Sequence, residues 1–389
     1  MDITIHPGLL RGEIPIIPSK SIAHRYLICA AFAGSPTILI CPDTSRDIAA
    51  TVDCLNALGA VIRRTDNGYD IEPIAAIPEK AILNCCESGS TLRFLLPIVG
   101  ALGVDTTFQM AGRLPQRPLS PLWEEMERMG CCLTRPTDDT IRCTGKLRPG
   151  TYTIDGGVSS QYITGLMLAL PMINGGTDLI VTGTLESKPY VTMTVHAKGL
   201  FGLPGTLSPG TVNVEGDWSN GAFFLAAKAL GCELDVLGLN PDSAQGDRAV
   251  VEILEQMDGG TPTVSAKDIP DLVPILSVVA AAMHGAVFTD IRRLRLKESD
   301  RVASTIAMIE NLGGRAEADE NTLTVFGTGL TGGIVNTCND HRIAMSAAIA
   351  ATVCKENVTV LGSECVSKSY PRFWEEYARL GGNYELNVR

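Results

Sequence analysis

The chain has 389 residues, of which 45% are hydrophobic, and carries a net charge of −11. That length is sufficient for two domains, each with its own core. The acidic balance argues against non-specific nucleic-acid binding, which needs broad basic surfaces. It does not exclude small anionic ligands, because a local cluster of Lys and Arg can outweigh the global charge.

The first residues, MDITIHPG, show no basic region followed by an apolar run, so we expect no signal peptide. The apolar stretch from Leu272 to Met283 is too short to span a bilayer. Twelve cysteines, with the adjacent pairs Cys85-Cys86 and Cys131-Cys132, show no metal-ligand spacing. We therefore expect a cytoplasmic protein whose cysteines are buried thiols.

A helical pattern that ends near a glycine and is followed by a strand-like run recurs along the chain. We expect each glycine to end its helix in the left-handed conformation, and the alternation predicts an α/β protein of six units in two domains. For any single copy, a glycine that merely ends a helix before a strand remains the alternative. Between Phe201 and Val214 the third unit is expected to be truncated. The six glycines, spaced by roughly 65 residues, are Gly59, Gly130, Gly202, Gly259, Gly313 and Gly381.

In the first half, polar residues form short blocks at the predicted starts of apolar helices. Pro18 to Arg25 follows a strand-like run (Glu13 to Ile17) and opens a helix expected over Ala23 to Ala33. Glu87 to Arg93 and Gly112 to Pro118 form the next two blocks. Hydroxyls and backbone N–H groups at a helix start suit an anion, although a helix cap or an exposed loop explains any one block.

Two further blocks complete this half. Gly156 to Tyr162 precedes an apolar helix expected over Ile163 to Leu170, and Glu186 to Tyr190 has the same character. Two hydroxyls and an amide at one helix start predict a neutral cradle for a phosphate.

The second half combines carboxylates with basic residues. A helix cap explains Asp271, and a solvated ion pair explains Glu298 with Arg301, when each is taken alone. Together the blocks indicate a cleft for a substrate with several negative charges and acid–base chemistry. The chain has no GxxxxGK[ST] sequence, which argues against a nucleoside triphosphate. The blocks are Asp268 to Asp271, Leu296 to Arg301, Asn339 to Arg342 (before an apolar run, Ile343 to Thr352) and Ser367 to Pro371.

In their order along nearly the whole chain, these blocks resemble the family of 5-enolpyruvylshikimate-3-phosphate (EPSP) synthases. The segments that carry the resemblance are PSKSIAHR, DGGVSSQYITGLMLALP, ESKPY, DIPDLVP, LRLKESDR, NDHRIAMS and SKSYP. The resemblance implies a two-domain inside-out α/β barrel, with three βαβαββ-type units per domain and the active site in the interdomain cleft. One domain would comprise residues 1–18 and 217–389, and the other residues 19–216.

The resemblance also implies transfer of the enolpyruvyl group of phosphoenolpyruvate to the 5-hydroxyl of shikimate 3-phosphate. Phosphate leaves after a tetrahedral intermediate, without a metal or cofactor. Asp271 would activate the hydroxyl, and Glu298 and Lys20 would deliver and remove the methylene proton. Shikimate 3-phosphate would contact Lys20, Ser21, Arg25, Ser159, Ser160, Gln161, Ser187, Tyr190, Asp271 and Lys297. Phosphoenolpyruvate would contact Lys20, Gly89, Arg117, Gln161, Arg301, His341, Arg342 and Lys368.

The sequence departs from the family at Glu87-Ser88-Gly89-Ser90, where many relatives carry Asn-Ala-Gly-Thr. We expect Glu87 to point away from the phosphate or to pair with an arginine, and sensitivity to glyphosate stays open. Arg293 stands where some relatives have Asn, and the region from Phe201 to Val214 is short.

Two alternatives to this function have different sequence requirements. A sister enzyme that modifies a UDP-amino sugar typically uses a reactive cysteine, and the loop Arg113 to Pro118 has none. A catalytically inactive binding protein would not need Asp271, Glu298, Lys20 and Lys368 together. We expect a monomer with small-molecule substrates and no nucleic-acid or membrane partner.

Overall fold

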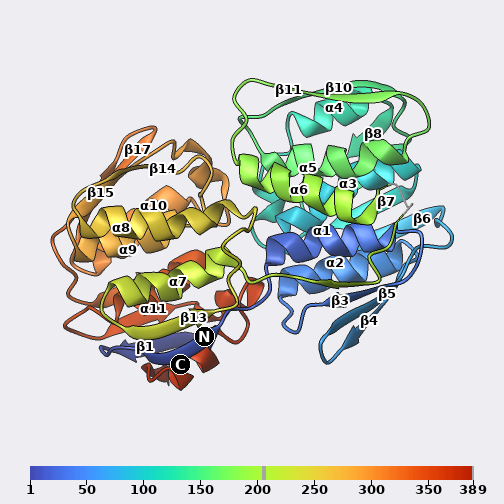
Figure 1. The fold of residues 1–389 in the computed structure, drawn as a ribbon. Coiled ribbons are helices and arrows are strands. Elements are labelled where there is room, and N and C mark those ends of the chain that lie inside the picture. Colours follow the sequence, from blue (N-terminus) through green and yellow to red (C-terminus); the bar gives the residue numbers. More distant parts are fainter. Residues whose placement is uncertain (204–206, 388–389) are drawn as a thin grey trace. The chain divides into compact units, whose positions relative to one another are not determined.

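The computed structural model describes residues 1–203 and 207–387, which form two compact units. Unit 1 comprises Met1–Ile17 and the chain from Gly216 onward, and unit 2 comprises Pro18–Glu215 (Figure 1). These boundaries lie within one residue of those expected. The chain passes twice between the units. On the unit 1 side of these passages the Asp217 amide donates to the Ile17 carbonyl at 2.9 Å, and on the unit 2 side the Ser19 amide donates to the Glu215 carbonyl at 2.8 Å.

Unit 2 contains two four-stranded mixed sheets, with strand orders β12-β3-β5-β4 and β6-β7-β9-β8, and a parallel pair, β10-β11. Its helices are α1 (Lys20–Ala31), α2 (Arg46–Ala57), α3 (Gly89–Leu102), α4 (Leu122–Arg128), α5 (Ser160–Ala169) and α6 (Lys188–Phe201), with short 3-10 turns at Leu114–Gln116 and Leu170–Met172. Its strands are β3 (Thr37–Ile40), β4 (Val61–Thr65), β5 (Gly68–Glu72), β6 (Lys80–Asn84), β7 (Asp105–Gln109), β8 (Cys131–Thr134), β9 (Thr140–Gly145), β10 (Gly150–Asp155), β11 (Thr177–Thr182) and β12 (Thr211–Asn213).

Unit 1 repeats this plan, with the orders β18-β19-β1-β20, β14-β15-β17-β16 and the parallel pair β13-β2. Its helices are α7 (Trp218–Ala229), α8 (Val250–Asp258), α9 (Val273–Ala282), α10 (Arg301–Asn311), α11 (His341–Ala350) and α12 (Phe373–Arg379), with 3-10 helices η3 (Gly246–Ala249), η4 (Arg292–Leu296) and η5 (Ser363–Lys368). Its strands are β1 (Asp2–His6), β2 (Arg11–Pro15), β13 (Glu233–Leu237), β14 (Thr263–Ser265), β15 (Gly285–Thr289), β16 (Arg315–Ala318), β17 (Thr322–Phe326), β18 (Gly333–Asn336), β19 (Val358–Leu361) and β20 (Asn383–Asn387).

One continuous βαβαββ segment in each unit builds a complete sheet. The segment β6-α3-β7-α4-β8-β9 and the segment β14-α9-β15-α10-β16-β17 give the same strand order and the same directions. The third sheet of each unit has two hydrogen-bonded strands in the described chain. The three repeats expected within each domain are therefore unequal in size. In the region from Phe201 to Val214, where a truncated unit was expected, the structure has a three-residue strand, β12, and residues 204–206 lie outside the described residues.

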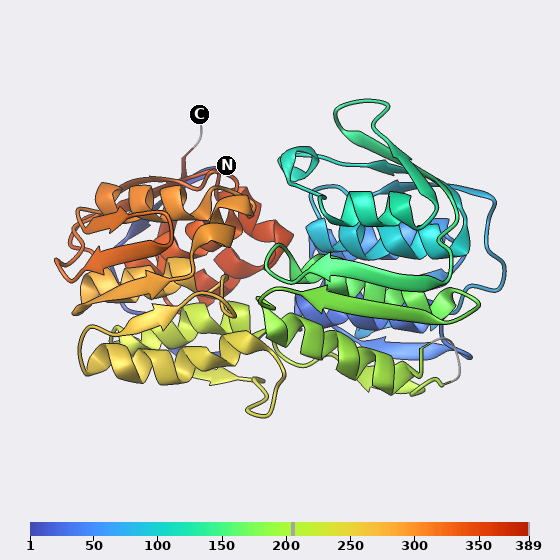
Figure 2. The same cartoon turned by 90° about the horizontal axis from the view of Figure 1, so that it is seen from above.

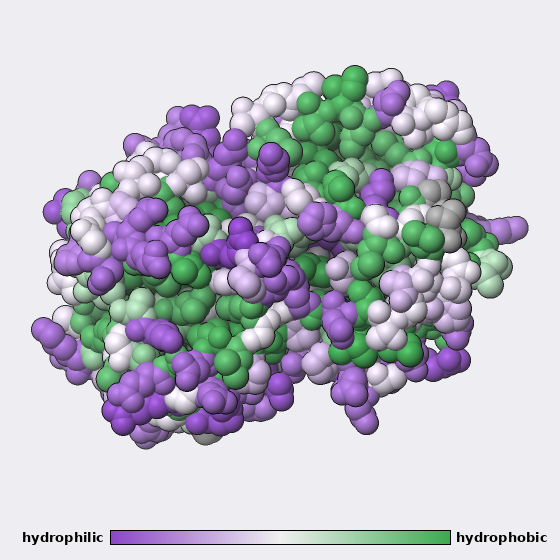
Figure 3. Space-filling model, in the orientation of Figure 1, coloured by the Kyte–Doolittle hydropathy of each residue, from purple (hydrophilic) through white to green (hydrophobic). Residues whose placement is uncertain are grey.

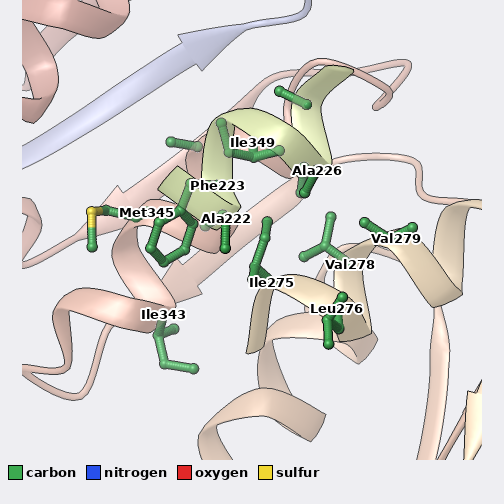
Figure 4. Packing of buried hydrophobic residues seen from close by; sticks show 14 of the residues in the cluster. Ala222, Phe223, Ala226, Ile275, Leu276, Val278, Val279, Ile343, Met345 and Ile349 are labelled. Atoms are coloured by element: carbon green, nitrogen blue, oxygen red, sulfur yellow. The ribbon is translucent and has the colours of Figure 1, made fainter. Parts of the chain in front are cut away.

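The core of unit 1 includes the contacts between its central helices. All ten residues of α11 and nine of the ten in α9 are buried, which is typical of a helix enclosed on all sides. Figure 4 shows side chains of α7, α9 and α11 packed together, among them Phe223, Ile275 and Ile349. Strands such as β7 and β17 alternate buried residues with more accessible ones instead. Each unit combines several helices with strands that run beside them, as Figures 1 and 2 show.

The glycines that end the repeated helices mostly behave as predicted. Five of the six have a positive φ, for example +93° at Gly381. Gly259 is the exception and corrects the prediction: its φ is −81°, and the next residue, Gly260, has a φ of +152°. With two glycines in a row, the reversal of the chain after α8 falls on the second one.

Three helices begin earlier in the chain than predicted. Helix α1 begins at Lys20, α5 at Ser160 and α11 at His341, two or three residues before the expected positions. The first turn of each helix carries polar residues that interrupt the apolar pattern. The last residues of these three blocks therefore belong to the helices rather than to loops in front of them.

The prediction that all cysteines are buried is wrong for Cys86, Cys132 and Cys338, which are exposed. Cys132 follows the buried Cys131 on strand β8, where successive side chains point to opposite faces. None of the helices in the described chain is both long and apolar enough to cross a membrane. On the face in Figure 3, hydrophilic residues surround separate hydrophobic areas.

Candidate active site

The start of α3 in unit 2 brings two arginines beside Gly89. A Cβ atom added to Gly89 would lie 2.6 Å from Arg93 Nη1 and 2.8 Å from Arg117 Nη1. Arg93 Nη2 donates to the Pro118 carbonyl at 3.1 Å, and its guanidinium lies 5.9 Å from the centre of the Tyr162 ring. Two guanidinium groups at a helix N-terminus favour an anion, because the helix dipole and the backbone N–H groups add to their charge.

Glu87, the departure from the family pattern, lies next to this site. Its carboxylate packs against the Cα atom of Gly112, where a Cβ atom would overlap it. Gly112 has a φ of +56°, so both its conformation and the close approach favour glycine. The Glu87 side chain therefore reaches the beginning of the loop that carries Arg117.

The predicted phosphate cradle adjoins the start of α3. Gln161 Nε2 donates to Ser90 Oγ at 3.1 Å, which connects the first turns of α5 and α3. Ser159 is the N-cap of α5 and accepts from the Gln161 amide at 3.3 Å, and Ser160 is buried. Ser187 is buried with a φ of +55°, a conformation that is uncommon outside glycine and is often found at functional sites. The structure thus brings the second and fourth blocks together.

Arg25 is more enclosed than the predicted substrate contact suggests. It is 2% exposed, and burial lowers its pKa to about 10. It donates to Thr194 Oγ1 at 2.9 Å, the Ser21 carbonyl at 2.6 Å, the Tyr190 carbonyl at 2.9 Å and Thr164 Oγ1 at 3.3 Å. Arg25 therefore joins α1, α5 and α6, with most of its N–H groups already bonded inside the unit.

Lys20, the first residue of α1, is held by an ion pair. Its Nζ atom lies 2.9 Å from Asp47 Oδ2 on α2, and each side chain is 16% exposed. The N-cap of α1, Ser19, makes no capping bond with its side chain, so a simple helix cap does not explain this block. The partly exposed pair gives the ammonium group a fixed place at the start of α1.

Unit 1 contains the second cluster of charges, centred on Arg301, which is 1% exposed. Its Nη1 atom donates to Asp271 Oδ1 at 2.7 Å and to the Pro270 carbonyl at 3.5 Å, and Nη2 donates to Glu298 Oε2 at 2.8 Å. Nε and Nη2 donate to the two oxygens of Asp340 at 3.0 and 3.3 Å. All five N–H groups are therefore bonded. Glu298 and Arg301 do form an i,i+3 pair, but the alternative of a solvated pair is wrong because Arg301 is buried.

Arg342, in the first turn of α11, differs from Arg301 because not all of its N–H groups are bonded within the described chain. Its Nη2 atom donates to Asp271 Oδ2 at 3.3 Å, whereas Nε and Nη1 are buried without a hydrogen-bond partner in the described chain. Buried donors without acceptors are unfavourable, so they suit a ligand that supplies oxygen atoms. Asp340, the N-cap, accepts from the Arg342 amide at 2.9 Å, and the neighbouring His341 is 3% exposed.

Asp271 lies between several cations. It contacts Arg301 and Arg342, and Lys297 Nζ lies 3.9 Å from its Oδ1 atom. Burial alone would raise the pKa of Asp271, but Arg342, Lys297 and Arg301 outweigh burial and hold it below the usual range. Asp271 is therefore ionised. It does not cap α9, whose N-cap is Leu272 without a side-chain bond, so that alternative is wrong.

Lys368 connects η5 to the loop before α11. It is 5% exposed, and its Nζ atom donates to the Asn339 carbonyl at 2.8 Å. Cys338 and Asn339 have φ values of +50° and +58°. Lys368 therefore stabilises a loop in an unusual conformation directly before His341 and Arg342.

The structure adds residues that the sequence-based site left out. Arg93, Asp47 and Asp340 each contact a predicted site residue, and Arg93 and Asp340 lie inside blocks that were recognised. Asp247 in η3 is buried and accepts from the Ser219 hydroxyl on α7. Burial, with Asp271 nearby, raises the pKa of Asp247 to about 7. In the described chain, His, Cys, Asp and Glu form no group of three placed to hold a metal ion.

The fold and these clusters define an α/β protein of two similar units, each with cationic side chains suited to a small anion, and with carboxylates beside the cations in unit 1. Residues 5–377 match the family model of EPSP synthase, 3-phosphoshikimate 1-carboxyvinyltransferase. The chain belongs to this family.

Relatives with this enzyme name align over nearly their whole length. The 3-phosphoshikimate 1-carboxyvinyltransferase of Clostridium kluyveri is 36% identical, covering 98% of both chains, and that of Clostridium beijerinckii is 35% identical, covering 100% of this chain and 99% of its own. The EPSP synthase of Acinetobacter baumannii shares the fold, with a TM-score of 0.81 at 23% identity and full coverage of both chains. The enolpyruvyl transferase NikO from Streptomyces tendae gives a TM-score of 0.74 at 18% identity, covering 100% of this chain and 99% of its own.

Proposed function

We propose that this protein transfers the enolpyruvyl group of phosphoenolpyruvate to the 5-hydroxyl of shikimate 3-phosphate and releases phosphate, a step of aromatic amino acid biosynthesis. One observation in unit 1 carries the proposal beyond family membership. Arg301 binds Asp271 at 2.7 Å and Glu298 at 2.8 Å, so one buried guanidinium holds both carboxylates that the reaction needs. An addition–elimination requires a base for the hydroxyl and an acid for the methylene carbon.

Asp271 is assigned as the group that accepts the proton of the 5-hydroxyl. Its lowered pKa keeps it ionised, but a carboxylate surrounded by cations is a weak base. Substrate anions that bind Arg342 and Lys297 would neutralise part of that positive charge and raise the pKa of Asp271. Substrate binding and activation of the base would then be coupled through the same cations.

The donors of Arg342 are assigned to the carboxylate of phosphoenolpyruvate. Arg301, the other predicted contact, reaches the substrate only if a protein carboxylate first leaves one of its N–H groups. Glu298 is 26% exposed and Asp271 21%, whereas Asp340 is fully buried, so the first two are the residues able to move. Once released from Arg301, Glu298 is assigned as a donor of the proton to the methylene carbon.

The remaining substrate contacts follow the two clusters. Gly89, Arg117 and Lys20 in unit 2, with Lys368 in unit 1, are assigned to the phosphate of phosphoenolpyruvate, with Gln161 and His341 beside it. Shikimate 3-phosphate is assigned to Ser21, Arg25, Ser159, Ser160, Ser187, Tyr190 and Lys297. We propose further that the units form an inside-out α/β barrel pair with the active site in the cleft between them, and that the protein is a cytoplasmic monomer.

A phosphate-release assay tests the function. Purified protein should release phosphate only when shikimate 3-phosphate and phosphoenolpyruvate are both present, and release with a UDP-amino sugar in place of shikimate 3-phosphate would overturn the assignment. Asp271→Asn should lower kcat by roughly 10²- to 10⁴-fold, the usual contribution of a general base. Its Kd for shikimate 3-phosphate should change less than tenfold.

Asp242→Asn is the matched control, since Asp242 is an exposed carboxylate of the same unit. It should retain full activity. An equal loss of kcat and of shikimate 3-phosphate affinity in Asp271→Asn would reduce Asp271 to a binding residue.

A further inference from the structure

Two helices of unit 2, α1 and α3, begin with predicted anion-binding residues, and their starts must be held in fixed relative positions. Helix α1 begins with Lys20 and Ser21, and α3 begins with Gly89. These starts belong to different parts of the chain, and α2, which contributes no predicted site residue, contacts both helices. Two polar side chains on α2, Asp47 and Thr51, form the connection.

Two polar side-chain contacts connect α1 and α2. Lys20 Nζ lies 2.9 Å from Asp47 Oδ2, and His24 Nδ1 lies 2.8 Å from Thr51 Oγ1. On each helix the two residues are four positions apart, so they lie on one face, one turn apart. Two contacts at equal spacing fix the position of α1 along the axis of α2.

The contact between His24 and Thr51 extends to α3 through a further hydrogen bond. Thr51 Oγ1 lies 2.6 Å from Thr91 Oγ1, and Thr91 Oγ1 donates to Ser88 Oγ at 2.7 Å. Ser88 is the N-cap of α3, accepts from the Thr91 amide at 3.2 Å and immediately precedes Gly89. A chain of four side chains therefore runs from His24 to the residue that begins the Gly89 site, and all four are buried.

The number of hydroxyl hydrogens determines which side chain donates and which accepts in each of these hydrogen bonds. Each hydroxyl has one hydrogen, so if Thr91 donates to Ser88, Thr51 donates to Thr91. His24 then donates from Nδ1 to Thr51. This arrangement suits a neutral imidazole, and burial, with the neighbouring Lys20 and Arg25, lowers the pKa of His24 well below its ordinary value.

We propose that Thr51 is a positioning residue for the anion site of unit 2. Its hydroxyl is the central member of the chain, accepting from α1 and donating to α3. It therefore holds the backbone N–H groups at Gly89 in register with Lys20. This inference rests on the proposed function only for the identity of the anion, phosphoenolpyruvate.

Thr51→Val tests the proposal, because valine keeps the shape of threonine and removes the hydroxyl. The His24 N–H and the Thr91 oxygen then lose their buried partner. The KM for phosphoenolpyruvate should rise about tenfold, the factor that corresponds to one buried hydrogen bond, while kcat should change less than about threefold. Thr51→Ser, which keeps the hydroxyl, should restore KM.

Amide hydrogen exchange gives a readout without substrates. The amides of Thr91 and Leu92 bond to Ser88 Oγ and to the Ser88 carbonyl, so they report on the start of α3. Their exchange should accelerate about tenfold in Thr51→Val. Thr305→Val is the matched control: Thr305 is fully buried on α10 in unit 1, and its hydroxyl has no hydrogen-bond partner in the described chain. It should change neither exchange at α3 nor KM.

The outcomes separate this inference from the proposed function. If the wild-type protein released no phosphate, the function would be wrong, yet the exchange rates would still decide the role of Thr51. Equal behaviour of Thr51→Val and Thr51→Ser, or unchanged exchange at Thr91 and Leu92, overturns the inference. If Thr51→Val fails to fold, Thr91→Val cuts the chain on its other side and should reproduce the same rise in KM for phosphoenolpyruvate.

Discussion

At the scale of single residues, the charges of unit 1 predict a pH dependence. Burial, with Arg301 and Arg293 nearby, lowers the pKa of the Lys297 ammonium to about 8, although Asp271 raises it. Below pH 8 Lys297 is charged and able to bind a phosphate. A bound phosphate stabilises the charged form and raises this pKa, so binding above pH 8 takes up a proton.

We therefore expect affinity for shikimate 3-phosphate to fall as pH rises above about 8, by up to tenfold per pH unit. The stability of the free protein should change in the opposite direction. The unfolded chain holds the Lys297 proton up to a higher pH, near 10.4, so unfolding becomes less favourable between about pH 8 and that value. Calorimetric titrations and thermal melts over pH 7–10 measure the two trends.

Lys297→Arg is the control for this dependence, since an arginine stays charged throughout that range. Its affinity should be nearly constant between pH 7 and 10. The same decline in wild type and Lys297→Arg would assign the titration to another group.

The same residues show how far the sequence predicts a site. Asp271, Glu298 and Arg301 were recognised within their blocks, because clustered acids and bases at helix starts are unusual. The pairing of Asp271 with Arg301 was not predictable, since these residues are thirty positions apart and contact each other only through the fold. Thr51 has no signal in the sequence at all: a threonine inside an amphipathic helix is ordinary, and its two partners come from other helices.

At the scale of elements, the contact between α3 and α5 depends on a glycine. A Cβ atom on Gly165 of α5 would overlap the Arg93 carbonyl of α3 and would lie 3.1 Å from Pro97. The close approach of these helices places Gln161 at 3.1 Å from Ser90. Helix α5 therefore owes its position at the anion site to the missing side chain.

Gly165→Ala should lower the free energy of unfolding by roughly 2–3 kcal/mol, because the added methyl group forces the helices apart in a packed core. Urea denaturation measures this change. Gly199→Ala in α6 is the matched control, since nothing lies within 4 Å of an added Cβ atom and the residue is exposed. That replacement should stabilise the protein by up to about 1 kcal/mol through the higher helix propensity of alanine. Equal destabilisation by both would contradict the packing argument.

The order and type of the elements were largely readable from the sequence, because the glycine-ended helices and the short strands repeat. The sizes of the three sheets in each unit were not predicted. Strand β12 has three residues, and in the described chain β2 pairs with β13, from more than two hundred residues further along the chain. Such long-range pairing leaves no local pattern, so the sequence predicts a truncated third unit but not the two large sheets and one small sheet that each unit has.

At the scale of the whole molecule, unit 2 is one uninterrupted segment with its own helices and sheets, whereas unit 1 is assembled from two segments. We expect residues 18–215 to fold as a separate protein, since a segment of this length encloses its own core. Circular dichroism of the expressed segment should show helix and strand and one cooperative thermal transition.

A matched protein joins residues 1–17 to residues 216–389 through a short linker. The Asp217 amide already bonds to the Ile17 carbonyl at 2.9 Å, so a short linker closes the gap. Each protein should unfold cooperatively. Loss of cooperative unfolding in the unit 2 segment would show that it depends on unit 1.

Strand β1 has a consequence for how the chain is made. Its residues pair with β19 on one side and with β20 on the other, and Ile3 and Ile5 are fully buried between them. On a ribosome, β1 emerges before unit 2, and both of its partners emerge after it. Unit 2 can therefore fold before the partners of β1 have been made. Completion of this four-stranded sheet joins strands that are synthesised before and after the whole of unit 2.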